Sequence, residues 1–238
     1  MRAAGNLTVA GDEKLWKYFR LERFITTIET GFIYFAAASQ FVDPFEGAVT
    51  IQPPGVAPVP TDQGTQSAFR ELKRLTKVSC WHRASYESDA MWNLYAGQHK
   101  GIAICTTPDR IQKALRPYRI KPSYEPEDIW VGGVEYVDLT QGRTPSGMLD
   151  RFFYKHNAFA WEREYRVAIS LREAEESGVQ VPLQGIFVEA DLNILIDRIV
   201  LGSTTTSDDR NTVVEELTKR GLEDRPELST LLGQPQYF

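Results

Sequence analysis

The sequence predicts an α+β fold, in which helices pack against a mixed, mostly antiparallel sheet. Stretches with strand periodicity and amphipathic helical stretches are interspersed along the chain, but the regular strand–helix–strand repeat of a parallel sheet is missing. The sequence also contains no glycine-rich phosphate loop of the Walker or dinucleotide-binding type. The common nucleotide-hydrolysing and dehydrogenase folds are therefore not expected.

Composition limits the functional classes. With 238 residues, 42% hydrophobic and 25% charged, the chain can bury the core of a single domain over 1–238. The net charge of −5 argues against a general nucleic-acid-binding surface. There is neither an apolar run of about 20 residues nor the apolar stretch of a secretory signal in the first twelve residues. Cys80 and Cys105 resemble reduced core thiols, and we expect a cytoplasmic protein that does not enter a membrane.

Local patterns define the first elements. Phe24, Ile25 and Ile28 give a helix one apolar face, and Gly31 is a natural C-terminal stop. A segment rich in Pro, Gly, Thr and Gln follows a turn. We predict, in order, a flexible segment at 1–12, a strand at 15–19, a helix at 21–30, a strand at 32–36, a turn at 43–47 and a surface loop at 47–65.

Caps and stops define the remaining elements. Ser88 and Ser207 are suitable helix N-caps, Pro108 stands at a first helical position, and Gly97 and Gly221 end helices. We predict helices at 66–77, 88–97, 107–115, 146–155 and 208–220, and strands at 78–81, 101–106, 131–137, 161–171, 186–188 and 194–201.

The most informative motif is WEREYRV at 161–167. In a strand, alternate residues share a face, so Glu162, Glu164 and Arg166 are expected to project together while Trp161 packs on the other side. Two carboxylates ~7 Å apart on one strand face repel unless they share a cation, which Arg166 can supply. The functional interpretation is a carboxylate held against a cationic transition state; the alternative is a solvated charged strand face.

Three further segments supply binding candidates. Tyr34 lies in an aromatic strand and is either a ligand contact or a core residue. Tyr18 and Arg20, beside Lys17, are placed to hold a phosphate or ribose, or to form a solvated strand edge. Trp92 lies one helical turn from Tyr95 and either packs in the core or forms the wall of a ligand pocket.

Five separated motifs resemble the bacterial family catalogued as domain of unknown function twenty-nine seventy-one. They are, in the family's order, LWKY at 15–18, IYFA at 33–36 with FVDPFE at 41–46, MWNLYA at 91–96 with KGI at 100–102, WEREYR at 161–166 and IVLG at 199–202. The resemblance covers residues 14–203. Val42 departs from it, because the family usually has Asn before Asp-Pro-Phe.

A more distant resemblance implies chemistry. The segment GFIYFA at 31–36 is similar to a segment of poly-ADP-ribose polymerases, whose tyrosine stacks on nicotinamide, and residues 162–164 are similar to the Glu-x-Glu strand of ADP-ribosylating toxins. The resemblance implies a split, mostly antiparallel sheet and NAD as substrate. It assigns Glu164 to the ribose and the oxocarbenium-like state, Glu162 to the acceptor and Tyr34 to nicotinamide. Together with the candidates from the residue patterns, the expected NAD-binding residues are Lys17, Tyr18, Arg20, Tyr34, Trp92 and Arg166.

Two other functions stay open. A non-catalytic module would bind a nucleotide or a partner without forming product. A metal-dependent nuclease or hydrolase would use Asp43, Glu46, Glu162 and Glu164 around a divalent cation. The sequence does not identify the acceptor or the oligomeric state.

Overall fold

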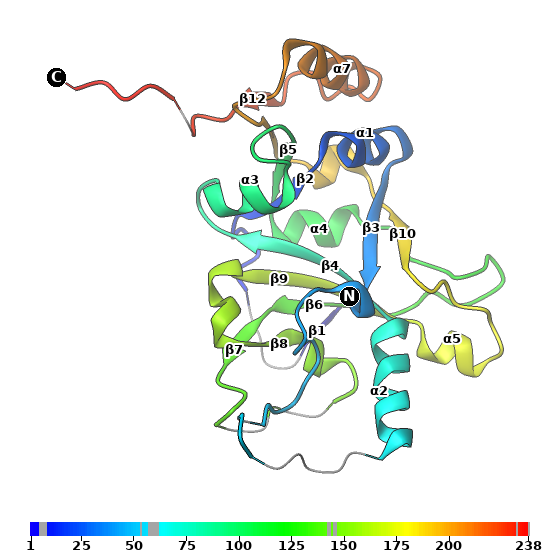
Figure 1. Ribbon diagram of the computed structural model, residues 1–238. Helices are drawn as coiled ribbons and strands as arrows, with labels where there is room; N and C mark the ends of the chain where they lie inside the picture. Colours follow the sequence, from blue (N-terminus) through cyan, green and yellow to red (C-terminus); the bar gives the residue numbers. More distant parts are fainter. Residues whose placement is uncertain are drawn as a thin grey trace. The chain divides into compact units, whose positions relative to one another are not determined.

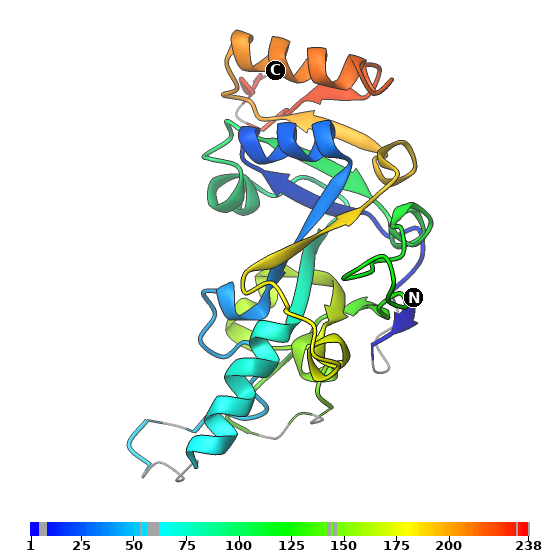
Figure 2. The same cartoon turned by 90° about the vertical axis from the view of Figure 1, so that its right-hand side faces the viewer.

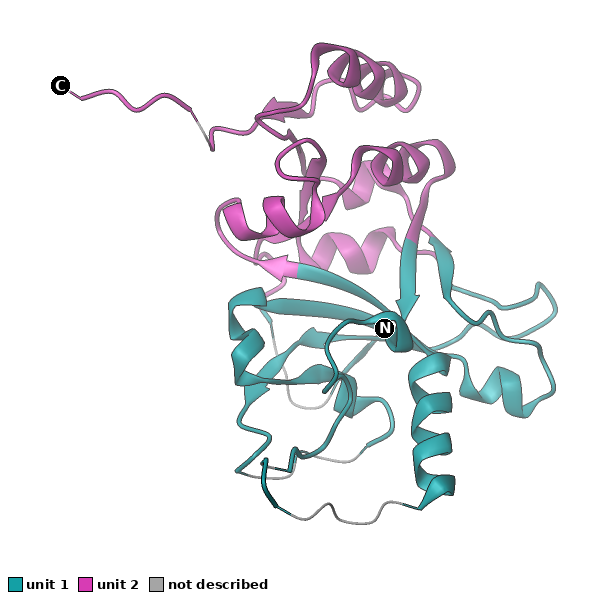
Figure 3. Cartoon of the chain, in the orientation of Figure 1, with its two compact units in different colours: residues 1–9, 34–81, 117–188 teal, residues 10–33, 82–116, 189–238 magenta. Residues whose placement is uncertain are grey.

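The computed structural model describes residues 1–4, 9–52, 54–56, 62–141, 144, 147–231 and 233–237. These residues form an α+β structure with a mostly antiparallel arrangement of strands, as predicted. The chain divides into two compact units, each made of three segments: residues 1–9, 34–81 and 117–188 in unit 1, and residues 10–33, 82–116 and 189–238 in unit 2 (Figure 3). No helix within the described ranges is long and apolar enough to cross a membrane.

Unit 1 is built on a sheet with the strand order β1-β6-β9-β4, and β3 pairs with both β4 and β10 (Figure 1). Strand β1 runs parallel to β6, whereas β6 with β9 and β3 with β4 are antiparallel. A separate parallel pair is formed by β7 and β8. The elements are β1 (Arg2–Ala3), β3 (Phe32–Ala37), η1 (Ala38–Gln40), α2 (Gln63–Leu75), β4 (Thr76–Arg83), β6 (Ile129–Gly133), β7 (Glu135–Val137), η2 (Asp150–Phe153), β8 (Tyr154–His156), η3 (Asn157–Glu162), β9 (Glu164–Ser170), α5 (Arg172–Glu176) and β10 (Gly185–Glu189).

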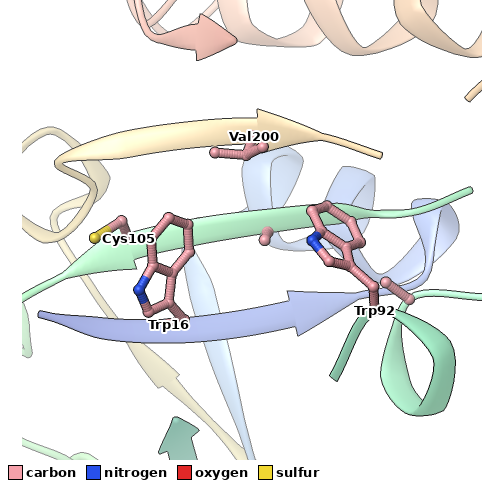
Figure 4. Close-up of a cluster of buried hydrophobic side chains, with 6 residues drawn as sticks. Trp16, Trp92, Cys105 and Val200 are labelled. Atoms are coloured by element: carbon pink, nitrogen blue, oxygen red, sulfur yellow. The ribbon is translucent and has the colours of Figure 1, made fainter. Parts of the chain in front are cut away.

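Unit 2 contains the antiparallel strands β2, β5 and β11, with β12 parallel to β11. Trp16 on β2 is in register with Cys105 on β5, and both belong to a buried cluster with Trp92 and Val200 (Figure 4). The elements are β2 (Leu15–Phe19), α1 (Leu21–Thr30), α3 (Asp89–Tyr95), β5 (Ile102–Thr106), α4 (Pro108–Ala114), α6 (Leu192–Leu195), β11 (Arg198–Leu201), α7 (Ser207–Thr218) and β12 (Pro226–Leu228).

Elements with strong local signals lie where the sequence predicts them. Strand β2 and helix α1 have the predicted bounds, and Gly31 ends α1 with a φ of 76°, a left-handed conformation that favours glycine. The side chain of Ser88 accepts from the backbone N–H of Met91, as an N-cap does. For α7 the cap is Thr206, one residue before the predicted cap.

Several predictions for loops and element types are wrong. Residues 2–4 of the supposedly flexible segment hold β1 and the fully buried Ala4, although 5–8 lie outside the described residues. The predicted loop at 47–65 ends earlier, because α2 begins at Gln63 with Asp62 as its N-cap; residues 53 and 57–61 lie outside the described part of the chain. Instead of the helix predicted at 146–155, the chain forms η2 and β8; 146 is not described. The first residues of the strand predicted at 194–201 belong to α6.

Helix α2 packs against the rest of unit 1 through its last turn, which carries the buried Leu75 (Figure 2). Just beyond it, the fully buried Lys77 donates from Nζ to the backbone carbonyls of Arg74 at 2.8 Å, Pro182 at 2.7 Å and Gln184 at 3.2 Å. Burial lowers the pKa of Lys77 to about 8, so the ammonium is still the main form at neutral pH. Three carbonyl acceptors and three N–H donors match each other.

We predict that Lys77→Met lowers the free energy of unfolding by about 2–4 kcal/mol, because the three carbonyls lose the hydrogen bonds donated by the buried ammonium. Urea denaturation measures the change. The matched control is Lys113→Met, since Lys113 is exposed on α4. Equal urea midpoints for the two variants would show that the carbonyl contacts contribute little.

Candidate functional site

The site is an ion cluster inside unit 1, centred on Arg166 of β9. The Arg166 side chain is 1% exposed, and its five N–H groups all have acceptors. Nη1 and Nη2 donate to the two carboxylate oxygens of Glu46 at 2.6 and 3.0 Å, and Nε and Nη2 donate to those of Glu164 at 2.7 and 3.2 Å. The backbone carbonyl of Phe152 takes the remaining N–H of Nη1 at 2.5 Å. Such complete pairing is what permits a buried guanidinium.

Glu46 reaches Arg166 because of a tight turn at 43–47. The Asp43 carboxylate accepts from the backbone N–H of Phe45 through Oδ1 at 2.8 Å, and the Asp43 carbonyl accepts from the N–H of Glu46 at 3.2 Å. Gly47 follows with a φ of 74°, and a Cβ there would lie 2.8 Å from the ring of Phe152. The turn therefore requires glycine at its end and fixes the direction of both acidic side chains.

A second cation, Lys155 of β8, connects the two glutamates of the WEREYRV motif. Its Nζ donates to Glu164 Oε1 at 2.9 Å and to Glu162 Oε2. It also lies 4.6 Å from the centre of the Phe159 ring, within range of a cation–π interaction. Glu162 and Glu164 thus share a cation, as expected, but that cation is Lys155, whereas Arg166 pairs with Glu164 and Glu46.

The local backbone at the motif differs from the predicted strand. Glu162 is the last residue of η3, Arg163 has a left-handed φ of 43°, and β9 begins only at Glu164. The two glutamates therefore reach Lys155 through a helical end and a strand start, not along one strand face. Trp161 is 46% exposed, so its expected packing on the opposite face is also wrong. The charged face is buried and not solvated.

The same surroundings move the pKa values of the two glutamates in opposite directions. Burial, together with a hydrogen bond to Glu164, raises the pKa of Glu162 from 4.5 to about 7, although Lys155 opposes the shift. Burial would raise the pKa of Glu164 too, but the charge of Arg166 and the hydrogen bonds of Glu162 and Arg166 hold it well below its ordinary value. Near neutral pH, Glu164 is a fixed anion and Glu162 can exchange a proton.

Tyr34, the expected nicotinamide contact, also belongs to unit 1 but has its own surroundings. Its hydroxyl donates to Gln40 Oε1 at 3.0 Å, and its ring packs against Phe187 with a centroid distance of 5.2 Å. The ring is half-buried on β3. A contact of Tyr34 with NAD stays a prediction.

Of the other expected NAD-binding residues, Arg166 is the centre of the cluster in unit 1, whereas the remaining four belong to unit 2. There the structure brings Tyr18 and Trp92 together with a ring-centroid distance of 5.2 Å, and the Tyr18 hydroxyl accepts from the N–H of Ser88. Trp92 is fully buried in the cluster of Figure 4, in agreement with the core alternative. Lys17 is half-buried, and Arg20 is exposed directly before α1. Their convergence with Glu164 stays a prediction.

The four carboxylates of the hydrolase alternative, Asp43, Glu46, Glu162 and Glu164, do lie in one cluster. Their neighbours, however, are the ammonium of Lys155 and the guanidinium of Arg166. Within the described ranges, no group of three or more His, Cys, Asp or Glu residues is arranged to hold a metal ion. The four carboxylates and the two cations therefore form an internal ion network.

Lys155 and Tyr136 are not among the site residues predicted from the sequence. The Tyr136 hydroxyl accepts from the backbone N–H of Glu164 at 2.8 Å and so helps to fix the start of β9. Both residues come from β7 and β8, two three-residue strands of a region for which the sequence predicted a single strand and a helix. Short parallel strands leave no periodic signal that would have identified them.

We predict that Arg166→Lys lowers the free energy of unfolding by about 3–5 kcal/mol. Lysine offers three donors where five acceptors are present, and it leaves a buried carboxylate incompletely paired. Chemical denaturation measures the loss. The control is Arg163→Lys in the same motif, where the side chain is exposed and we expect a change of at most ~0.5 kcal/mol. Similar losses in both variants would contradict the central role of Arg166.

We also predict a pH-dependent contribution of Glu162 to stability. The folded protein keeps a proton on Glu162 up to about pH 7, whereas an unfolded glutamate loses it near 4.5. The contribution is therefore complete below pH 4.5 and disappears as the pH rises to about 7, by ~1–3 kcal/mol. The difference in unfolding free energy between wild type and Glu162→Gln, measured from pH 4.5 to 8, reports it. A constant difference would refute the raised pKa.

Comparison with known proteins adds no relative. No family model matches the chain, and no curated protein or solved structure matches it either. The two resemblances stated for the motifs therefore remain predictions, and the functional argument depends on the geometry of the ion cluster.

Proposed function

We propose that this protein cleaves the bond between nicotinamide and ribose in NAD, as an ADP-ribosyltransferase or an NAD glycohydrolase. One observation carries the proposal: two neighbouring carboxyl groups, Glu162 and Glu164, have pKa values shifted in opposite directions around a shared ammonium. A pair of this kind is typical of enzymes that break glycosidic bonds with one fixed anion and one proton-exchanging carboxyl group.

The bond to nicotinamide needs little acid catalysis, because the leaving group is cationic in NAD and departs neutral. When the bond breaks, its electron pair goes to the nicotinamide nitrogen and positive charge develops on the ribose. Glu164 supplies fixed negative charge for that state. The oxygen of water or of an acceptor hydroxyl then forms a bond to the ribose carbon, and Glu162 takes up the proton that this oxygen loses.

The charge of the ion cluster and the solvent exposure of its side chains support this assignment. The cluster of Asp43, Glu46, Glu162 and Glu164 with Lys155 and Arg166 contains four carboxyl groups and two cations, an excess of acidic groups. The side chains of Glu46 and Arg166 are 0–1% exposed, whereas those of Lys155, Glu162 and Glu164 are 7–11% exposed. The Lys155 end of the cluster, where the proton-exchanging Glu162 lies, is therefore slightly more accessible than the Arg166 end.

The remaining roles follow from the resemblance to ADP-ribosylating enzymes and belong to the same proposal. Tyr34 would stack on nicotinamide, Lys17 or Arg20 would contact a phosphate, and Tyr18 would line the nucleotide. The proposal includes a cytoplasmic location, which suits the two free thiols of Cys80 and Cys105.

A second candidate function, non-catalytic nucleotide binding, is favoured by a specific contact pattern. Both carboxylate oxygens of Glu164 already accept hydrogen bonds from the chain's own cations. If the cluster only stabilises unit 1, NAD raises the melting temperature of the protein but no nicotinamide is released. Product analysis separates the two functions.

We predict that the purified protein releases nicotinamide from NAD and that Glu164→Gln lowers the rate by about 10²–10⁴-fold, because the shape is kept and the fixed charge is lost. Mass spectrometry measures nicotinamide. The exposed Glu125→Gln is the matched control and keeps the wild-type rate. Circular dichroism confirms that both variants are folded. An unchanged rate in Glu164→Gln rules out its assignment, and loss of activity with a chelator would favour the metal-dependent hydrolase.

A further inference from the structure

One carboxylate oxygen of the cluster has no hydrogen-bond partner in the described part of the chain. Asp43 Oδ2 is buried, the Asp43 side chain is 4% exposed, and no donor among the described residues bonds to this oxygen. Its nearest cation is Lys155 Nζ at 3.9 Å, which is too far for a hydrogen bond. A buried charged acceptor without a donor opposes folding. Asp43 is thus an incomplete position beside an otherwise well-paired network.

The turn prevents Asp43 from relieving this cost by rotating. Oδ1 is held by the N–H of Phe45, and the Asp43 carbonyl is held by the N–H of Glu46. Glu46 is in turn fixed by two hydrogen bonds from Arg166. Oδ2 therefore stays near Lys155, because the other polar groups of the turn are held by their own hydrogen bonds.

The chemistry of Asp43 Oδ2 and Lys155 Nζ determines which kind of group could bind between them. An ammonium has three N–H donors, and Lys155 uses two of them on Glu162 and Glu164. A hydroxyl oxygen ~2.8 Å from both atoms would close a triangle whose base is the observed 3.9 Å, accepting from Lys155 and donating to Asp43. A second cation would be repelled by Lys155, and an anion by Asp43. A neutral hydroxyl satisfies both atoms.

We propose that Asp43 and Lys155 together bind a hydroxyl group of the substrate, and that the substrate is therefore recognised through its sugar. This inference rests on the proposed cleavage of NAD, where the hydroxyl belongs to a ribose. Lys155 and Asp43 act here as binding residues, a role that the motif resemblance does not give to either of them. An ordered water is the competing occupant, and it would give no dependence of ligand affinity on Asp43.

The test compares Asp43→Asn and Asp43→Ser with wild type. Asn places an amide where the acceptor oxygen lies, and Ser keeps an oxygen that can accept from Phe45 while it deletes Oδ2. We expect each variant to bind ADP-ribose about 10–100-fold more weakly in isothermal titration calorimetry. The melting temperature without ligand should stay equal or rise, because the unpaired oxygen is gone. The exposed Asp224→Asn is the control and keeps wild-type affinity.

The outcomes separate this inference from the proposed function. If wild type neither binds ADP-ribose nor releases nicotinamide from NAD, the proposed function fails and the inference with it. If wild type binds ADP-ribose and both Asp43 variants bind equally well, only the inference is overturned, and a water fills the gap. If both variants lose affinity together with several degrees of melting temperature, Asp43 is a structural residue and the inference is also overturned.

Discussion

The guanidinium of Arg166 is the interaction on which unit 1 depends. It is nearly inaccessible to solvent and joins Glu46 to Glu164. Glu46 lies 120 positions from Arg166 in the sequence, whereas Glu164 lies two positions from it. Because a buried guanidinium without full pairing would cost several kcal/mol, the turn at 43–47, the end of η2 and the start of β9 must all be in place at once. The cluster is therefore a condition for the fold of this unit as well as a candidate site.

Once Arg166 is fixed, the electrostatics of the neighbouring glutamates follow. Glu164 receives hydrogen bonds from two cations and stays ionised, while Glu162 receives one from Lys155 and lies close to a second carboxylate. Two glutamates separated by a single residue therefore have different protonation states at neutral pH. The difference arises from which cation each can reach, and that is decided by the break between η3 and β9 at Arg163.

The local part of this structure was predictable and the non-local part was not. The strand β2, the helix α1 with Gly31 at its end and the cap at Ser88 all depend on interactions within a few residues, which sequence patterns record. Glu162, Glu164 and Arg166 were identified for the same reason, because they are close in the sequence. Lys155 reaches the cluster through tertiary pairing, and Glu46 was expected beside Glu162 and Glu164 only as a metal ligand. The helix predicted at 146–155 shows the limit: η2 and β8 replace it where Phe152 and Lys155 are buried.

The turn at 43–47 shows how one segment can serve both stability and binding. Its two acidic residues differ in their pairing: Glu46 accepts hydrogen bonds through both oxygens, whereas one buried oxygen of Asp43 has no donor among the described residues. A cluster that served only the fold would gain stability from replacing Asp43 by a residue without that oxygen, since an unpaired buried acceptor opposes folding. The rigid pairing of Glu46 with Arg166 is what holds the oxygen of Asp43 beside Lys155 in spite of this cost. The stable pairing of Glu46 with Arg166 at one end of the turn thus keeps the Asp43 oxygen at the other end available for a ligand.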